Sequence, residues 1–203
     1  MEEVKIGNQI WMKKNLDVVT FRNGGYIEQA ISRKHWCELR DENKPAWCYP
    51  DFDINNNEKL GKLYNWYAIL DPRGLAPQGW HIPSDSEWDL LADTLGGKDI
   101  AADKLKNDEG WPGFEETDDN DEPTGVFIKD EGNNLSGFLA LPSGYIFYHG
   151  DYFGFDYISF FATSDAYEER IPIFRYVSSG WSELGTSVDD TCGGGSIRCV
   201  KNI

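Results

Sequence analysis

The chain has 203 residues and a formal net charge of -16, and 14% of its residues are aromatic. The negative charge repels phosphate backbones, so we expect no nucleic-acid partner, and the aromatic residues supply enough apolar surface to bury a sizeable core. No run of about 18 or more apolar residues is present, so no transmembrane segment is expected. No signal peptide precedes Val4, so a leader, if the protein carries one, is absent from this chain.

The first half of the chain is predicted to contain short strands followed by helices. Residues 4–12, divided by a Gly-Asn turn, are expected to form a strand or a hairpin, and residues 18–21 a second strand. Residues 27–39 are compatible with a helix. A better-supported helix begins near Leu63, because apolar residues recur there at positions i, i+3, i+4 and i+7. These residues are Leu63, Trp66, Tyr67 and Leu70.

A second well-supported helix begins at Ser84. Ser84 and Glu87 have the spacing of a capping box, in which each side chain bonds a free backbone N–H at the start of the helix. Trp88, Leu91 and Leu95 then form the apolar face that we expect to be buried. A Gly-Gly pair directly after this face is a typical end for a helix.

The second half of the chain has the composition of a β-rich region. A polar, acidic connection spans residues 107–135, and runs of aromatic and β-branched residues follow it. The predicted strands are 138–141, 145–148, 159–162, 171–177 and 196–200. Helices in the first half and strands in the second favour an α+β fold over an alternating α/β arrangement. Because neither an internal repeat nor a linker divides the sequence, we expect residues 1–203 to form a single domain.

Distinctive sequence blocks recur from one end of the chain to the other. They are Ile-Gly-Asn-Gln-Ile-Trp-Met (6–12), Asn-Leu (15–16), Phe-Arg-Asn-Gly (21–24), Pro-Ala-Trp-Cys-Tyr (45–49), Gly-Lys-Leu-Tyr-Asn-Trp-Tyr-Ala (61–68), Asp-Pro-Arg-Gly-Leu-Ala-Pro (71–77), Gly-Trp-His-Ile-Pro-Ser-Asp (79–85), Leu-Ala-Leu-Pro-Ser-Gly-Tyr (139–145) and Ile-Arg-Cys-Val (197–200). In this order the blocks resemble the Fibrobacter succinogenes major paralogous domain.

This resemblance implies a C-type-lectin-like fold, in which the terminal strands pair, two helices pack beside them and a loop-rich second half carries any binding surface. Members of the family look like secreted or surface-exposed bacterial proteins, so the resemblance also implies an extracellular or cell-surface location. The chain departs from the family pattern at 160–164 and at 194–196. Family properties therefore transfer least to the segment 178–195.

Oxygen-bearing side chains alternate over Asp51, Asp53 and Asn55, as they do at the start of a calcium-binding loop. However, Asn56 stands where such a loop has a glycine, and Lys62 stands where it has a bidentate glutamate. The two interpretations are a calcium site formed by Asp51, Asp53 and Asn55, and a polar surface turn. The Glu-Pro-Asn and Trp-Asn-Asp signatures of calcium-dependent lectins do not occur in the sequence.

The four cysteines, Cys37, Cys48, Cys192 and Cys199, allow three disulfide pairings or none. Formylglycine-generating enzymes, which share the lectin-like fold more distantly, carry redox-active cysteines near the C-terminus. The spacing and surroundings of Cys192 and Cys199 differ from that pattern. No nucleophile–base pair, paired carboxylates or phosphate-binding loop stands out, and His81 is interpreted as a packed residue beside a helix start. We therefore expect no enzymatic activity.

Aromatic residues are dense between residues 145 and 157, where glycine and aspartate separate them. At strand spacing, half of these side chains should pack in the core, and the other half are available for a ligand surface. The candidate contacts are Tyr152, Phe153, Tyr157 and Trp181. The predicted function is a non-enzymatic surface binding or adhesion module for a glycan or a protein. The alternatives are an enzyme related to formylglycine-generating enzymes and a structural component of the cell envelope.

Overall fold

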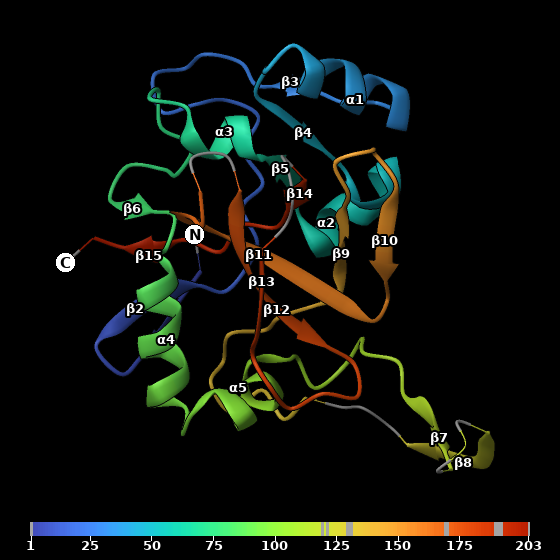
Figure 1. The fold of residues 1–203 in the computed structure, drawn as a ribbon. Coiled ribbons are helices and arrows are strands. Elements are labelled where there is room, and N and C mark those ends of the chain that lie inside the picture. The colour runs from blue at the N-terminus through green and yellow to red at the C-terminus, as the bar shows by residue number, and fades with distance from the viewer. Residues whose placement is uncertain are drawn as a thin grey trace.

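The protein is an α+β structure in which short helices surround two main β-sheets (Figure 1). The computed structural model describes residues 2–118, 120, 122–128, 132–168, 171–188 and 193–202. Its α-helices are α1 (Arg33–Asp41), α2 (Asn57–Leu60), α3 (Trp66–Leu70), α4 (Asp85–Thr94) and α5 (Lys98–Leu105). Two 3-10 turns, η1 (Pro50–Phe52) and η2 (Ile54–Asn56), precede α2. None of the helices in these ranges has the length and apolar character that a membrane span requires.

The smaller main sheet joins the N-terminal and C-terminal segments, whose ends lie on the same side of the molecule in Figure 1. Its strands are, in spatial order, β1 (Glu3–Ile6), β2 (Gln9–Met12), β15 (Val200–Lys201) and β6 (Trp80–His81). β1 and β2 form an antiparallel hairpin, and Val200 of β15 pairs with Trp11 of β2. The expected pairing of the terminal strands is therefore confirmed, although β15 has only two residues.

The buried side chain of Arg198 strengthens this junction. Its guanidinium donates hydrogen bonds to the backbone carbonyls of Met12, Lys13 and Phe138 and to the side-chain oxygen of Asn15. It also lies over the ring of Phe138, at 4.4 Å from the ring centroid. Because arginine presents five donors in one plane, a single side chain links the end of β2 to the segment before β15.

The larger sheet has nine strands and occupies the centre of the molecule in Figure 1. Its strands are, in spatial order, β13 (Gly185–Val188), β12 (Pro172–Ser178), β11 (Ile158–Ala166), β9 (Ser143–Ile146), β14 (Gly194–Gly195), β5 (Leu63–Asn65), β4 (Ala46–Cys48) and β3 (Glu28–Gln29), with β10 (Tyr152–Phe155) paired to β9. The acidic connection 107–135 contains a separate two-stranded sheet of β7 (Phe114–Thr117) and β8 (Pro123–Ile128), which projects from the body (Figure 1).

An aromatic cluster brings α4 together with both main sheets. Trp88 of α4 contacts Trp11 of β2, Phe138 and Phe161 of β11, with ring centroids 4.9, 5.7 and 5.3 Å away. Trp66 of α3 belongs to a second cluster. Trp66 and Trp88 are 2% and 0% exposed, which confirms that both helices bury their tryptophan.

Helix α4 forms as the sequence predicts. Ser84 Oγ accepts a hydrogen bond from the Glu87 backbone N–H at 3.2 Å, and Glu87 Oε2 accepts one from the Ser84 N–H at 2.8 Å. Trp88 and Leu91 are buried on the expected face. The other carboxylate oxygen of Glu87 lies 2.8 Å from Nε2 of His81, so His81 packs against the helix start. The local capping signal is therefore sufficient to place this helix.

The helix predicted near Leu63 is shorter and begins at Trp66. Leu63 belongs to β5, and Leu70 is 51% exposed. The prediction that Leu63, Trp66, Tyr67 and Leu70 form one apolar face of a helix is therefore wrong. Asn65 accounts for the difference. Its side-chain oxygen accepts hydrogen bonds from the backbone N–H groups of Ala68 in α3 and Ala46 in β4. Its side-chain amide donates a hydrogen bond to the carbonyl of Lys44, before β4. These bonds hold the preceding residues in the sheet and start the helix after them.

Three other predicted elements also differ in extent. Residues 18–21 and 138–141 form isolated bridges rather than strands. In the second of these segments, Leu139 has a φ of +61°, which an extended strand does not allow. Residues 27–39 divide into β3 and α1, because the Ser32 side chain accepts a hydrogen bond from the backbone N–H of His35 and caps the helix there.

Candidate functional site

The β9–β10 hairpin carries aromatic side chains on one face. Phe153 of β10 lies opposite Tyr145 of β9 in antiparallel register, so the two side chains share that face. Phe153 and Tyr157 are 43% and 39% exposed, and their ring centroids are 5.5 Å apart. The ring of Phe153 also lies 5.5 Å from that of half-buried Phe147. We call Phe147, Phe153 and Tyr157 the aromatic strip.

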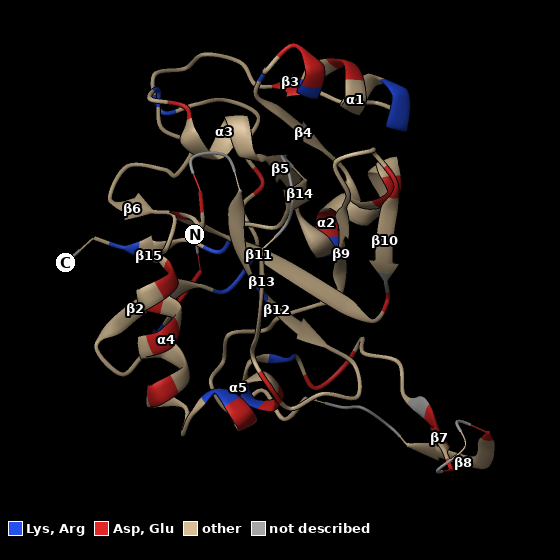
Figure 2. Cartoon of the chain, in the orientation of Figure 1, with Lys and Arg blue, Asp and Glu red and all other residues tan. Residues whose placement is uncertain are grey.

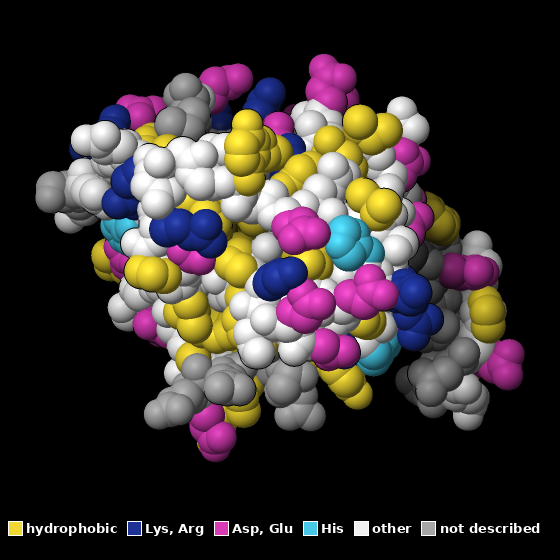
Figure 3. Space-filling model, turned by 90° about the horizontal axis from the view of Figure 1, so that it is seen from above, with side chains coloured by type: hydrophobic (Ala, Val, Ile, Leu, Met, Phe, Trp, Pro, Cys, Tyr) yellow, Lys and Arg dark blue, Asp and Glu magenta, His cyan; other side chains and the backbone are white. Residues whose placement is uncertain are grey.

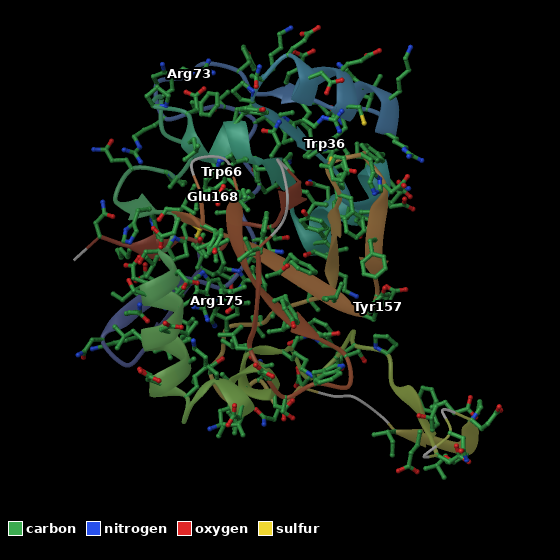
Figure 4. The ribbon with its side chains drawn as sticks, in the orientation of Figure 1. Trp36, Trp66, Arg73, Tyr157, Glu168 and Arg175 are labelled. Atoms are coloured by element: carbon green, nitrogen blue, oxygen red, sulfur yellow. The ribbon has the colours of Figure 1, made fainter. Side chains whose placement is uncertain are left out.

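The backbone around Tyr157 adopts a conformation that few residues tolerate. Tyr157 lies in the turn between β10 and β11 (Figure 4), directly after Asp156 with a φ of +70°. Gly154 has a φ of +81°, and a Cβ at this position would lie 2.0 Å from the side chain of Ile158. Glycine is therefore required for the close approach of β10 to β11, which brings Phe153 and Tyr157 together.

Tyr152 lies on the other face of β10, because successive residues of a strand point to opposite sides. Its ring packs against the buried cluster that contains Trp36. Its hydroxyl donates a hydrogen bond to the Ser143 carbonyl at 2.9 Å, and burial raises the pKa of Tyr152. The structure thus places Tyr152 beneath the hairpin and separates it from the exposed rings of Phe153 and Tyr157.

A path of ring contacts continues from the aromatic strip across the larger sheet. Phe147 contacts Tyr145 at 5.3 Å, Tyr145 contacts Phe160 of β11 at 4.8 Å, and Phe160 contacts Tyr176 of β12 at 5.2 Å. Gly185 of β13 makes room for the last ring, since a Cβ there would lie 2.1 Å from Tyr176. Tyr145 is buried and the other three rings are half-buried, so this path supports the strip from within the sheet.

Trp181 lies in the turn after β12 and is 65% exposed. The Ser179 N–H donates to the Tyr157 carbonyl at 2.7 Å, which holds this turn beside the β10–β11 turn. Trp181 lines a pocket of about 140 Å³, whose other lining residues are Tyr176, Ser178 and Glu183. Three of the four predicted contacts, Phe153, Tyr157 and Trp181, are therefore exposed on neighbouring segments.

Charged side chains surround the hairpin on the side of α1. Arg40 lies over the ring of Tyr148 at 5.9 Å and donates to its carbonyl. Arg33 forms an ion pair with Asp151, and Nδ1 of His149 lies 2.9 Å from the Asp151 carboxylate. The face that carries α1 and α3, seen from above in Figure 3, accordingly shows hydrophobic side chains interspersed with charged ones. Exposed rings beside charged groups suit a ligand that has both apolar and polar surfaces.

Asp51 lies in η1, Asn55 lies in η2, and Asp53 lies between these two turns. The Asp53 carboxylate caps η2 by accepting hydrogen bonds from the backbone N–H and the side-chain amide of Asn55, at 2.9 and 2.8 Å. Asp51 is exposed, with a φ of +52°. Within the described ranges, no group of three or more His, Cys, Asp or Glu side chains is placed to hold a metal ion. Calcium binding by Asp51, Asp53 and Asn55 stays a prediction.

The described cysteines Cys37, Cys48 and Cys199 are free thiols, and Cys192 lies outside the described residues. Burial raises the pKa of Cys199 to about 12 and also raises that of Cys48. Because the thiolate is the nucleophilic form of cysteine, burial keeps both thiols unreactive at neutral pH.

Neither a curated protein nor a solved structure matches this sequence. The sequence model of the Fibrobacter succinogenes major domain, in contrast, matches residues 4–201, a range that includes β15, all but the first residue of β1 and the aromatic strip. The match confirms the resemblance of the sequence blocks and extends over nearly the whole chain. The protein therefore belongs to the Fibrobacter succinogenes major domain family.

Proposed function

We propose that this domain is a non-enzymatic binding or adhesion module of the bacterial cell exterior, whose glycan or protein ligand docks on the aromatic strip and Trp181. The proposal includes a C-type-lectin-like fold, supported by the pairing of β2 with β15 and by the packing of α4 beside them. The observation that carries the proposed function is that Phe153 and Tyr157 are both exposed and in ring contact.

Exposed and adjacent rings favour binding for two reasons. Covering apolar surface contributes about 25 cal/mol per Å² removed from water, and aromatic rings provide much of that surface in one piece. The rings here are also held in place before any ligand arrives, by Gly154 below the turn and by Phe147 beside Phe153. A preorganised surface loses less conformational entropy on binding, so more of the contact energy appears as affinity.

Glycan and protein arrays followed by calorimetric titration test the proposal. Phe153→Ala and Tyr157→Ala should fold normally, with unchanged circular dichroism, and each should weaken ligand binding by about 2 kcal/mol, or about 30-fold. Tyr26→Ala is the matched control, because it removes an 83% exposed ring outside the strip. The affinity of the Tyr26→Ala variant for the ligand should equal that of the wild type.

Two results would contradict the proposal. If Phe153→Ala and Tyr157→Ala both keep wild-type affinity for a ligand that the arrays identify, the aromatic strip is not its site. If the arrays yield no ligand at all, a structural role in the cell envelope is favoured instead. Copper-dependent oxidation of a cysteine peptide by the protein would indicate the formylglycine-generating chemistry.

A further inference from the structure

A different pocket, of about 190 Å³, contains no residue of the aromatic strip. It lies where the chain leaves β2, and α2, the segment after α5 and the segments before β9 and β15 complete its walls. Its polar lining residues are Lys13, Lys14, Asn15, Lys59, Asn107 and Arg198. Residues that are far apart in sequence therefore converge on one small cavity.

The pocket is cationic although the chain carries a net charge of -16. Lys13, Lys14 and Lys59 line it, and no carboxylate is found among the described lining residues. In the described part of the chain, none of the three lysines forms an ion pair. Acidic residues appear on α1, α4, α5 and the β7–β8 sheet, and Glu58 precedes Lys59 on α2 (Figure 2). Unpaired like charges in a concave site raise the local concentration of anions.

Arg198 adds a buried positive charge to the same pocket. Its side chain is 1% exposed, and its hydrogen bonds go to neutral backbone carbonyls and to Asn15. Burial lowers the pKa of Arg198 to about 9. The neighbouring groups that the structure describes therefore do not fully offset the cost of burying its positive charge. A buried charge is costly unless an opposite charge accompanies it, and an anion in the pocket would reduce that cost.

Leu139 and Leu141 give the pocket an apolar wall. Leu139 has a φ of +61°, in the left-handed region that branched side chains rarely adopt. Such conformations persist where the surrounding structure holds them, and they concentrate at binding sites. Ammonium groups and an apolar wall together suit an anionic group attached to a compact carbon skeleton.

Two adjoining pockets limit where the anionic group can lie. One, of about 260 Å³, shares Lys14 with the cationic pocket, and the other, of about 160 Å³, shares Lys59. Carboxylates line both, Glu2 and Asp17 in the first and Asp156 in the second, and Asp17 also forms an ion pair with Lys62. An anion is therefore repelled from both sides and favoured in the centre, whereas a neutral part of the ligand has room to extend.

We propose that the cationic pocket binds the oxyanion group of a small organic ligand. This group is a carboxylate, sulfate or phosphate, and the carbon skeleton of the ligand lies against Leu139 and Leu141. Lys14 and Lys59 supply charge-assisted hydrogen bonds to the oxyanion from the rim. This site is separate from the aromatic strip and does not depend on the ligand proposed for that surface.

NMR titration of the ¹⁵N-labelled chain tests the site with sulfate, phosphate and glucuronate. Chloride keeps the ionic strength constant, and glucose is the neutral control for glucuronate. We expect saturable shifts at the side-chain amides of Asn15 and Asn107, in the millimolar range, for at least one of the three oxyanions and none for glucose. The order of affinities shows whether a sugar acid or an inorganic oxyanion is the better ligand. If none of the three produces saturable shifts at Asn15 and Asn107, the proposal is refuted.

Charge-removing variants test the assignment of the lysines. Lys14→Gln and Lys59→Gln change exposed side chains, and each should raise the dissociation constant of the oxyanion about threefold to tenfold. Lys34→Gln removes the same charge from α1 and should change it less than about twofold. Equal losses in all three variants would show a general effect of net charge and would overturn the proposal. Wild-type affinity in both Lys14→Gln and Lys59→Gln would overturn it as well.

Discussion

Trp88→Ala is expected to destabilise the protein strongly, because Trp88 joins segments that are distant in sequence. Its ring is fully buried and contacts Trp11 of β2, Phe138 and Phe161 of β11. Alanine would leave a cavity between these three rings. Strand pairing holds β2 and β11 in separate sheets, so the surrounding structure has little freedom to collapse into the space.

The magnitude follows from the area and contacts of the Trp88 ring. A buried aromatic side chain removes about 150–250 Å² from water, which corresponds to about 4–6 kcal/mol at about 25 cal/mol per Å². Its indole N–H has no hydrogen-bond partner among the residues that the structure describes, and an unpaired buried donor costs about 1–3 kcal/mol. The difference is about 1–5 kcal/mol. The unfilled cavity adds to it, so the expected loss is in the usual range for Trp→Ala, about 3–5 kcal/mol, out of a typical total stability of about 5–15 kcal/mol.

Urea unfolding followed by circular dichroism measures this loss. The midpoint should fall at an unchanged slope, and the melting temperature should fall by about 6–20 °C. Trp88→Phe keeps a ring in the cluster and removes the unpaired N–H, so it should cost less than half as much. Trp181→Ala is the control at an exposed tryptophan and should stay within about 0.5 kcal/mol of the wild type. Equal midpoints for Trp88→Ala and Trp181→Ala would refute the reasoning.

Three further predictions concern capping, pH and calcium. Ser84→Ala should lower the stability by about 1 kcal/mol through the lost cap of α4, measured by urea unfolding; an unchanged midpoint would show that the cap is dispensable. Burial raises the pKa of Glu87, but hydrogen bonds from Ser84 and His81 outweigh this effect, so the pKa lies below its usual value of 4.5. Its contribution to stability is therefore present above pH 4.5 and is lost as the pH falls through the lower folded-state pKa, and Glu87→Gln should flatten the stability profile in that acidic window. A profile of Glu87→Gln as steep as that of the wild type would contradict this. If calcium binds at Asp51, Asp53 and Asn55, the melting temperature should rise with calcium concentration in the wild type and not in Asp53→Ala, whereas no shift and no calorimetric heat at millimolar calcium would exclude the site.

Sequence patterns predict the elements of this fold whose structure is determined locally. Helix α4 is such a case, because Ser84 and Glu87 satisfy its first turn from within the helix. The segment around Leu63 is not, although its apolar spacing is equally helical. There, Asn65 accepts a hydrogen bond from the first residue of β4, Ala46, and donates one to the carbonyl of Lys44, and these distant partners decide where β5 ends and the helix starts. An asparagine before an apolar run is a capping signal that would have placed this start correctly.

The candidate site also depends partly on local sequence and partly on contacts with residues that are distant in the chain. Strand alternation predicts that Phe153 and Tyr152 face opposite ways, but it does not reveal which of the two is exposed. That depends on the cluster around Trp36, which comes from a distant helix. The cationic pocket has even less local signal, since Lys59 and Arg198 join Lys13 and Lys14 only in the folded chain.

The junction of β2 with β15 has a consequence for how the protein reaches its folded state. The carbonyl of Met12 receives a hydrogen bond from Arg198, 186 residues later in the chain. During synthesis the β1–β2 hairpin emerges early, and the edge of β2 stays unpaired until residues 197–201 have left the ribosome. Contacts of such sequence separation also slow folding, because loop-closure entropy is lost before they form. We therefore expect docking of the last strand to be the final folding step, and nascent chains that lack it to remain open to chaperones and proteases.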